Sequence, residues 1–289
     1  MDGILIINKP KGYTSRDVVN IVKKALNTPK VGHTGTLDPN ATGVLPILLG
    51  KATKVSKYLI EHDKEYIAEL KLGEKSSTGD PEGEIIEKCA IPTLNQGKIS
   101  KVLSSFQGKQ LQTPPIYSSI KINGKKAYEY ARSGQKIEMP SREIEVYEIN
   151  LISFENNNII FKVHCSKGTY IRTLCEDIAQ KLGTVGMMNN LCRTKVDEFE
   201  IKNAITLDEL QTLDNLPLIS IENTFKNLKS IYMDNKKTSL FLNGVKLTYH
   251  EPDGVYKIYN NNIFLGLGVI NNKLLKRDVV IIDNWLNYV

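Results

Sequence analysis

The stretch VGHTGTLDPNATGVLPILLG, residues 31 to 50, joins a glycine-rich loop to a long apolar run. Gly32, Gly35 and Gly43 lie close together in it, and Asp38 is its single acidic residue. Asp38 followed by Pro39 is typical of a helix start, because Asp accepts hydrogen bonds from free backbone N–H groups and Pro suits the first helical position. The alternative is a reactive carboxylate, since such loops let a ligand approach the backbone closely.

The residues before this stretch predict a buried strand followed by a helix. GILIIN, residues 3 to 8, is a continuous apolar run that KPKG closes. Thr14 and Asp17 have the spacing of a capping box, and the apolar residues that follow recur at helical intervals: Val18, Ile21, Val22 and Ala25.

The residues after it predict hairpins that alternate with helices. EYIAELKL, residues 65 to 72, alternates as a half-buried strand does, with Tyr66 at its start. Residues 143 to 154 and 159 to 165 flank ENNN as a hairpin, and the helix that begins near residue 169 should end at Gly183. The pattern indicates an α+β fold with a mixed, largely antiparallel central sheet flanked by helices.

The texture of the chain changes near its C-terminal end. TLDEL, residues 206 to 210, predicts a short helix within a connector, and from Ile231 onward short apolar runs are broken by the turn signals LNG, EPDG, YNNN and LGLG. This is typical of a small β-rich domain. We therefore expect two domains, residues 1–225 and 230–289.

Basic residues gather in two segments. The chain has 38 Lys and Arg against 32 Asp and Glu, a formal net charge of +6. One basic segment covers residues 8 to 30 and includes Lys9; the other covers residues 121 to 136 and includes Arg132 and Lys136. Tyr128 and Tyr130 interleave with the second segment, and aromatic rings among cations favour contact with unpaired bases. The alternative is two solvated helix faces.

Other site types have no signature in the sequence. The four cysteines have no C-x-x-C spacing and no His at ligand distance, which favours reduced thiols and predicts no metal site. No phosphate-binding G-x-x-x-x-G-K-[ST] loop occurs. The apolar run near the N-terminus is too short for a signal peptide or a membrane span, so we expect a cytoplasmic protein without membrane attachment.

Six blocks of the sequence resemble the TruB family of tRNA pseudouridine-55 synthases. They are NKPKGYTS (8 to 15), GHTGTLDPNATGVLPILLGKATK (32 to 54), DKEY (63 to 66), LGEKSSTGDPEGE (72 to 84), QTPPIYSSIKINGKKAYEYARSG (112 to 134) and HCSKGTYIRTL (164 to 174). The resemblance implies the pseudouridine synthase fold. More weakly, the C-terminal segment resembles the PUA-type RNA-binding domain that often follows it.

The resemblance implies an isomerase that converts uridine 55 of the tRNA T-loop to pseudouridine, with no metal or cofactor. Asp38 matches the family's catalytic aspartate. It could attack C1′, add to C6 of the ring or remove the 2′ proton, and the sequence leaves these three open. A base inside a folded T-loop is out of reach, so it must be flipped out of its stack.

The same resemblance gives roles to other residues. Arg172 matches the arginine that pairs with the catalytic aspartate and would keep it ionised, against the effect of burial. Tyr66 matches the tyrosine that stacks on the uracil and is a candidate for C5 deprotonation. The substrate-binding candidates are His33, which would fill the vacated stack; Tyr170 and Leu191, which would contact the base; and Lys9 and Arg132, which would meet phosphates. Asp80 matches a recurrent family acid, with its role open.

One segment departs from the family pattern. Cys192 stands where the family commonly has a basic residue, and Asp197 and Glu198 stand where Gly-Pro is usual. We expect weaker RNA contact there.

The main interpretation is a monomeric enzyme that acts on tRNA without a protein partner. A non-catalytic RNA-binding or tRNA-folding protein on the same scaffold is one alternative, although it would not require Asp38, Tyr66 and Arg172 together. A synthase that depends on a guide RNA is another. A glycoside hydrolase is disfavoured, because the motif offers one carboxylate where hydrolysis normally uses two.

Overall fold

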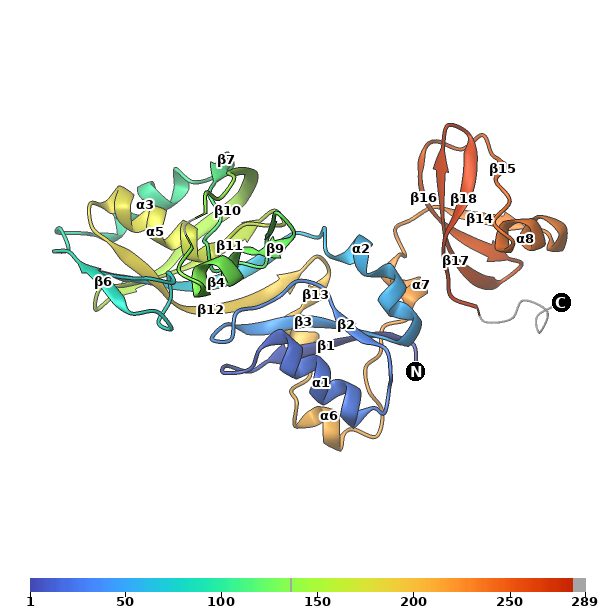
Figure 1. Cartoon of the computed structure of the whole chain (residues 1–289), viewed down its shortest axis with the longest axis horizontal. Coiled ribbons are helices and arrows are strands. Elements are labelled where there is room, and N and C mark those ends of the chain that lie inside the picture. Colours follow the sequence, from blue (N-terminus) through green and yellow to red (C-terminus); the bar gives the residue numbers. More distant parts are fainter. Residues whose placement is uncertain (136, 283–289) are drawn as a thin grey trace.

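The structure is a computed structural model that describes residues 1–135 and 137–282. In it the chain forms a large sheet covered by helices and a second, smaller sheet at the C-terminal end (Figure 1). Lys136 of the second basic segment and residues 283–289 of the expected C-terminal domain lie outside the described residues. Among the described residues, none of the helices combines the length and the hydropathy that a membrane span requires.

The large sheet has nine strands within the described residues, in the order β1-β3-β12-β4-β11-β10-β7, with β2 beside β3 and β13 beside β12. The pairing of β3 with β12 is parallel and the other pairings are antiparallel, which confirms the expected mixed, largely antiparallel sheet. The strands are β1 (Gly3–Lys9), β2 (Val31–His33), β3 (Thr42–Leu49), β4 (Lys64–Leu72), β7 (Gly108–Gln112), β10 (Arg142–Glu155), β11 (Asn158–Cys165), β12 (Gly186–Val196) and β13 (Phe199–Glu200).

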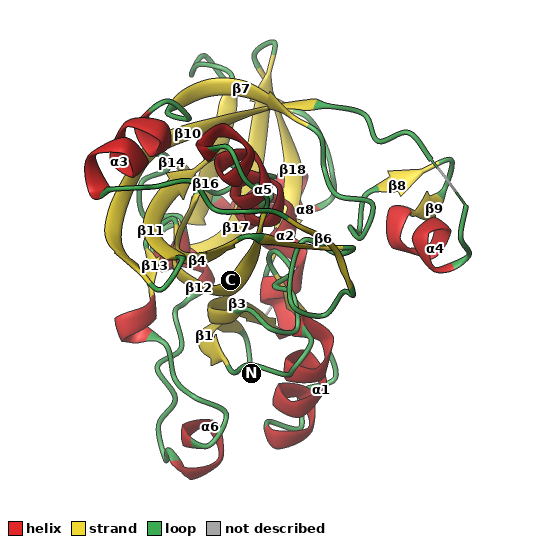
Figure 2. Cartoon of the chain, turned by 90° about the vertical axis from the view of Figure 1, so that its left-hand side faces the viewer, coloured by secondary structure: helices red, strands yellow, loops and turns green. Residues whose placement is uncertain are grey.

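Helices and two small hairpins surround this sheet. Figure 2 shows the hairpin of β8 and β9 together with α4 standing apart from the sheet, on the side away from α3. The helices are α1 (Ser15–Ala25), η1 (Gly50–Val55), α2 (Ser56–Leu59), α3 (Gln96–Ser104), α4 (Ala127–Arg132), α5 (Ile171–Leu182), η2 (Ile201–Asn203), α6 (Glu209–Thr212) and α7 (Ile221–Thr224), and the hairpins are β5 (Glu74–Ser76) with β6 (Ile85–Lys88) and β8 (Lys121–Ile122) with β9 (Lys125–Lys126).

Several predicted elements are confirmed with the local chemistry that defines them. The Thr14 side chain accepts a hydrogen bond from the Asp17 backbone and the Asp17 carboxylate accepts one from the Thr14 backbone, so the capping box of α1 is complete. The turn between β10 and β11 has positive φ at Asn156 and Asn157, as a tight hairpin requires. Gly183 ends α5 in the left-handed conformation, at φ 90°.

Two apolar clusters fix the helices on the large sheet. Helices α3 and α5 pack over β4, β10 and β11 around Phe161 and Ile178, both fully buried. Helix α1 packs over β1 and β3 through Val18 and Val22. The packing brings the start of α1, the loop before β3 and the start of α5 to one side of the sheet.

The C-terminal sheet has the order β14-β16-β17-β18-β15 within the described residues, and its β-rich character confirms the expectation. Helix α8, which the sequence did not predict, packs with its core. An apolar cluster runs from Ile4 and Val196 in the large sheet to Leu267 and Val279 in this one. The domain division at residues 225 and 230 stays a prediction. The elements are β14 (Ser230–Met233), α8 (Asn235–Leu242), β15 (Leu247–Thr248), β16 (Gly254–Asn260), β17 (Ile263–Asn271) and β18 (Leu274–Val280).

The predicted helix start at Asp38 is wrong. The carbonyl of Asp38 accepts a hydrogen bond from the N–H of Ala41, 3.0 Å away, which closes a turn through Pro39, and strand β3 begins at Thr42. Asp-Pro suits turns as well as helix starts. The apolar run from Val44 pairs along its length with β1, and this tertiary pairing decides for strand.

Candidate active site

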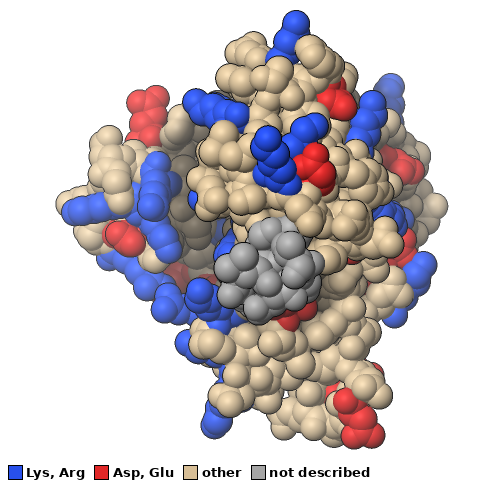
Figure 3. All heavy atoms as spheres, turned by 90° about the vertical axis from the view of Figure 1, so that its right-hand side faces the viewer, with Lys and Arg blue, Asp and Glu red and all other residues tan. Residues whose placement is uncertain are grey.

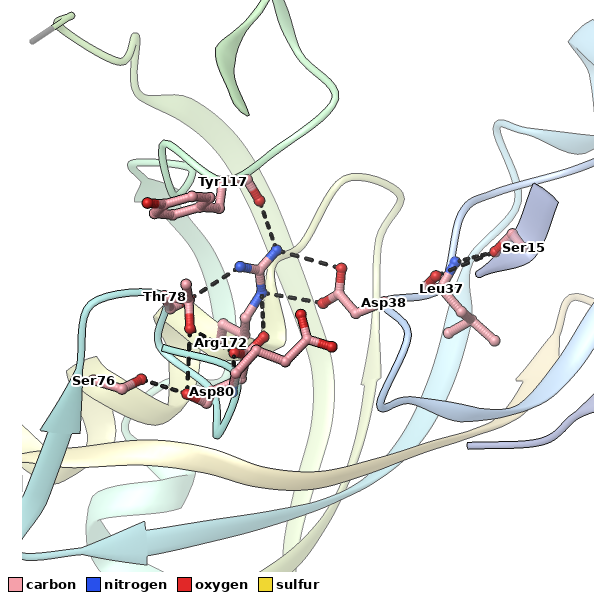
Figure 4. A network of polar contacts seen from close by, with 9 residues as sticks. Ser15, Leu37, Asp38, Ser76, Thr78, Asp80, Tyr117 and Arg172 are labelled. Carbon is pink, nitrogen blue, oxygen red and sulfur yellow. Dashed lines mark hydrogen bonds and ion pairs between the residues drawn. The ribbon is translucent and has the colours of Figure 1, made fainter. Parts of the chain in front are cut away.

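Asp38 is held in place by the residue before it. The Ser15 hydroxyl, at the first position of α1, accepts a hydrogen bond from the Leu37 N–H (2.9 Å) and donates one to the Leu37 carbonyl (3.2 Å). Figure 4 shows this clamp on one side of Asp38 and Arg172 on the other. Sequence reasoning missed Ser15, because nothing local to α1 indicates that the loop folds back onto it.

Arg172, in the first turn of α5, pairs with Asp38 as the resemblance implied. Its Nε lies 3.1 Å from Asp38 Oδ2, and one terminal nitrogen lies 3.4 Å from Asp38 Oδ1. The remaining donors reach the carbonyls of Thr78 (3.0 Å) and Tyr117 (2.8 Å). Arg172 is 6% exposed. Because its Nε and both terminal nitrogens have acceptors, the guanidinium has a fixed orientation toward the carboxylate.

Asp80 forms a second carboxylate layer behind Arg172. Its Oδ2 lies 4.0 Å from Arg172 Nε, and its Oδ1 accepts hydrogen bonds from the Thr78 hydroxyl (2.5 Å) and the Glu82 N–H (3.1 Å). The Ser76 hydroxyl donates to the Asp80 carbonyl. Asp80 therefore organises the loop that supplies the Thr78 carbonyl to Arg172 (Figure 4).

Burial dominates the protonation of Asp38. It raises the pKa of the carboxyl above the ordinary aspartate value, and the charges of Arg172 and Lys9 oppose this while Asp80 adds to it. Arg172 thus limits the effect of burial without cancelling it. A carboxylate of raised pKa is a better proton acceptor than an ordinary one, which suits general-base work as well as attack on carbon.

The pair lies in a cavity of about 420 Å³. Among the residues expected at the site, those that line the cavity are Asp38, Tyr66, Tyr170, Arg172 and Leu191. They come from the loop before β3 and from β4, α5 and β12, elements far apart in the sequence. A concave site with apolar walls and a few convergent polar groups is typical of a ligand pocket.

Tyr66 and Arg193 also line the cavity. Burial raises the pKa of Tyr66 to about 12, which keeps its hydroxyl protonated at neutral pH, although the Arg193 charge acts the other way. Arg193 is 1% exposed and donates to the carbonyls of Val44 (2.7 Å) and Gly35 (3.1 Å). Gly43 has φ 103°, and a Cβ there would lie 2.2 Å from the Arg193 carbonyl oxygen. This glycine therefore serves the contact with β12.

Lys9 does not lie where a phosphate could meet it, so that expectation is wrong. Its side chain is fully buried, and its Nζ donates to the carbonyls of Pro10 (3.0 Å), Tyr13 (2.7 Å) and Pro39 (3.0 Å). Burial lowers its pKa to about 8. Lys9 supports the turn that carries Asp38, because Pro39 follows Asp38 directly.

His33 and Arg132 lie outside the cavity lining. His33 ends β2, its Nδ1 is buried without a hydrogen-bond partner among the described residues, and burial lowers its pKa. Arg132 is at the end of α4, with its guanidinium 5.5 Å from the centroid of the Tyr128 ring, and Tyr128 lines the cavity. Figure 3 shows Lys and Arg side chains gathered around a hollow beside a projecting lobe. The positions of His33 and Arg132 do not test the roles predicted for them.

The departure at Cys192 does not reach the cavity. Leu191 and Arg193 line it, whereas Cys192 lines a separate surface hollow with Lys11 and Asn190. A missing cation at this position therefore leaves the charge of the cavity lining unchanged. Asp197 takes φ 49° in the turn between β12 and β13, and Glu198 is paired with Lys226.

No group of three or more His, Cys, Asp or Glu in the described part of the chain is arranged to hold a metal ion. The polar groups of the cavity are one ion pair, tyrosines, hydroxyls and cations. This arrangement can bind an uncharged polar ring next to an anionic backbone and offers one carboxylate to its reacting atoms.

Known proteins are similar to this chain in sequence and in fold. The family model for the TruB family pseudouridylate synthase N-terminal domain matches residues 23–171, and the model for the tRNA pseudouridylate synthase B C-terminal domain matches residues 172–216. The chain is 44% identical over 283 residues to tRNA pseudouridine synthase B of Alkaliphilus oremlandii, covering 94% of each protein. It is 45% identical over 284 residues to the protein of that name from Clostridium acetobutylicum, covering 96% of this chain and 98% of the relative.

Solved structures agree on the fold. A chain from an H/ACA RNP bound to a substrate RNA containing 2′-deoxyuridine superimposes with a TM-score of 0.73 at 23% identity, over 97% of this chain and 85% of that one. A chain from a Cbf5-Nop10-Gar1 complex gives 0.70 at 25% identity, over 98% and 84%. With the pseudouridine synthase fold, the paired Asp38 and Arg172 and the family match over most of the sequence in agreement, the chain belongs to the TruB family of pseudouridylate synthases.

Proposed function

We propose that the protein converts uridine 55 in the T-loop of tRNA to pseudouridine. The observation that carries the proposal is the ion pair of Asp38 and Arg172 at the wall of the cavity. The relatives named tRNA pseudouridine synthase B support tRNA as the substrate, since the identity extends over nearly the whole chain.

The reaction needs few groups, because it is an isomerisation. The bond from C1′ to N1 breaks, the uracil turns, a bond from C1′ to C5 forms, the hydrogen on C5 leaves as a proton and N1 gains one. Asp38 is the group that acts at C1′, at C6 or on the 2′ proton. Arg172 orients it, and Tyr66, Tyr170 and Leu191 hold the ring.

The raised pKa of Tyr66 bears on its second role. At a pKa of about 12 the phenol is protonated at neutral pH, so in this state of the protein it can donate a hydrogen bond to the base but is a weak acceptor for the C5 proton. Stacking against uracil is the role that its buried place in the cavity supports better.

The substrate must be flipped into the cavity, since the reacting atoms are covered in a folded loop. We propose that His33 fills the gap left in the stack and that the segment from β8 to α4, with Arg132 and Tyr128, positions the RNA. We further propose that the enzyme acts as a cytoplasmic monomer without a protein partner, cofactor or guide RNA. The non-catalytic alternative would not account for an arginine that pairs with Asp38 at the cavity wall while its other donors hold it in place on the carbonyls of Thr78 and Tyr117.

Tritium release tests the proposal. Purified protein alone should release tritium from a T-arm hairpin labelled at C5 of uridine 55 and not from the same hairpin labelled only at other uridines. Release that depends on an added guide RNA would contradict independent action. Binding without release would favour the non-catalytic alternative.

A further inference from the structure

Arg142, the first residue of β10, differs from the other cations of the cavity because part of its guanidinium has no hydrogen-bond acceptor. Arg172 is paired with Asp38, Arg193 is bonded to two carbonyls, and Lys64 Nζ donates to the carbonyls of Ile60 and His62. Arg142 donates to the Gly168 carbonyl, while its Nε is buried with no hydrogen-bond partner among the described residues. No carboxylate of the described chain forms an ion pair with it.

The guanidinium of Arg142 is nevertheless held in position by two neighbouring residues. Its central carbon lies 4.8 Å from the centroid of the Tyr170 ring, so the cation covers one face of that ring. Its other neighbour is Gly168, at φ 78°, where a Cβ would lie 3.1 Å from the same carbon. A glycine thus leaves room for the guanidinium beside a turn that lines the cavity.

A fixed cation without an anion indicates a ligand that brings one. Charged groups that lose water are normally paired, and an unmet N–H in a buried place costs free energy until an acceptor arrives. Arginine presents a planar fork that fits phosphate oxygens, and stacking on an aromatic ring fixes the direction of that fork. Tyr170 is also the residue expected to touch the target base, so the fork lies beside the place where the base of a flipped nucleotide would bind.

We propose that Arg142 binds the phosphodiester next to the uridine that enters the cavity. The inference rests on the proposed function, because it takes RNA as the ligand of this cavity. Arg142 would fix the backbone of the flipped nucleotide while Tyr170, under its guanidinium, contacts the base. A purely structural Arg142, which only holds the turn at Gly168, would not respond to the charge of one linkage.

Binding of T-arm hairpins with single neutral linkages tests this contact. The protein carries Asp38→Asn so that no turnover occurs, and each hairpin has one methylphosphonate in the T-loop. We expect Arg142→Gln to weaken binding of the unmodified hairpin about tenfold and to lower the salt dependence of log K by about 0.7. One linkage beside uridine 55 should weaken binding about tenfold with Arg142 present and less than about twofold without it.

Two further variants control for folding and for charge. Lys109→Gln removes one positive charge from β7, the strand paired with β10, and should leave the response to that linkage intact. Gly168→Ala displaces the guanidinium but keeps its charge, and should reduce the response. Thermal unfolding of each variant establishes that it is folded.

The two proposals fail in different ways. The contact of Arg142 would be overturned if the losses in binding free energy from Arg142→Gln and from each neutral linkage simply added. The proposed function would still stand if the unmodified protein released tritium. If the unmodified protein released no tritium and did not prefer the T-arm hairpin over an unrelated hairpin, the proposed function would be overturned. The contact of Arg142 would be overturned with it.

Discussion

The two sides of the cavity differ in how far their polar groups are already satisfied. On one side Arg172 pairs with Asp38, lies 4.0 Å from Asp80 and donates to two backbone carbonyls, and both Arg172 and Asp80 are buried. On the other side the segment from β8 to α4 stands apart from the sheet, with Arg132 exposed against Tyr128 (Figure 2). Groups with a fixed orientation are suited to stabilising a reaction, whereas exposed cations are suited to salt-dependent contacts with RNA phosphates.

Among the three replacements of Arg172, Lys9 and Arg132, loss of Arg172 should have the largest effect on catalysis. Arg172→Gln removes the partner of a half-buried carboxylate, so kcat should fall by about 10² to 10³-fold. The pKa of Asp38, already raised by burial, should rise further, because the guanidinium that opposes burial is gone. If the ionised carboxylate is the active form, the acid limb of the rate profile moves to higher pH, and rates measured across a pH series would reveal this. The kcat of Arg172→Lys should lie between those of the unmodified protein and Arg172→Gln. An acid limb that does not move in Arg172→Gln would contradict the effect of the guanidinium on the pKa of Asp38.

Loss of Lys9 should act on stability. Lys9→Met leaves the carbonyls of Pro10, Tyr13 and Pro39 without their shared donor, so the free energy of unfolding should fall by about 2 kcal/mol. Chemical denaturation measures the change. Lys11→Met is the matched control, since Lys11 is exposed, and it should change stability by less than about 0.5 kcal/mol. Equal losses in both variants would mean that Lys9 is not the support of the turn.

Loss of Arg132 should have the smallest effect and should concern binding alone. Arg132→Gln should raise KM for tRNA about threefold, with kcat unchanged, because an exposed phosphate contact contributes little once screened by salt. Steady-state kinetics at two salt concentrations separates the two parameters. Lys98→Gln, on α3 away from α4, should leave both unchanged (Figure 2). A fall in kcat with Arg132→Gln would place α4 in the chemical step.

Local patterns in the sequence predicted the elements that local chemistry defines. The capping box at Thr14, the alternation around Tyr66 and the end of α5 at Gly183 each depend on neighbours a few residues away. The resemblance to the family supplied the pairing of Asp38 with Arg172, which no spacing rule could give across 134 residues.

The failures at the site involve contacts made at long range. Asp38 and Pro39 have the letters of a helix start, and pairing with β1 turns the segment that follows into a strand. Lys9 belongs to a basic segment by composition, and only the fold buries it under the Pro39 carbonyl. The clamp of Ser15 on Leu37 and the seat of Arg142 against Gly168 join segments that no sequence period relates.

Replacement of Asp38 tests whether its carboxylate carries out the reaction. The carboxylate is held by Arg172 on one side and follows the clamped Leu37 on the other, so Asp38→Asn should keep the shape of the site and remove its reacting charge. The variant should release no tritium from the T-arm hairpin labelled at C5 of uridine 55, while it binds that hairpin within about threefold of the unmodified protein. Tritium release at the unmodified rate by Asp38→Asn would contradict the account.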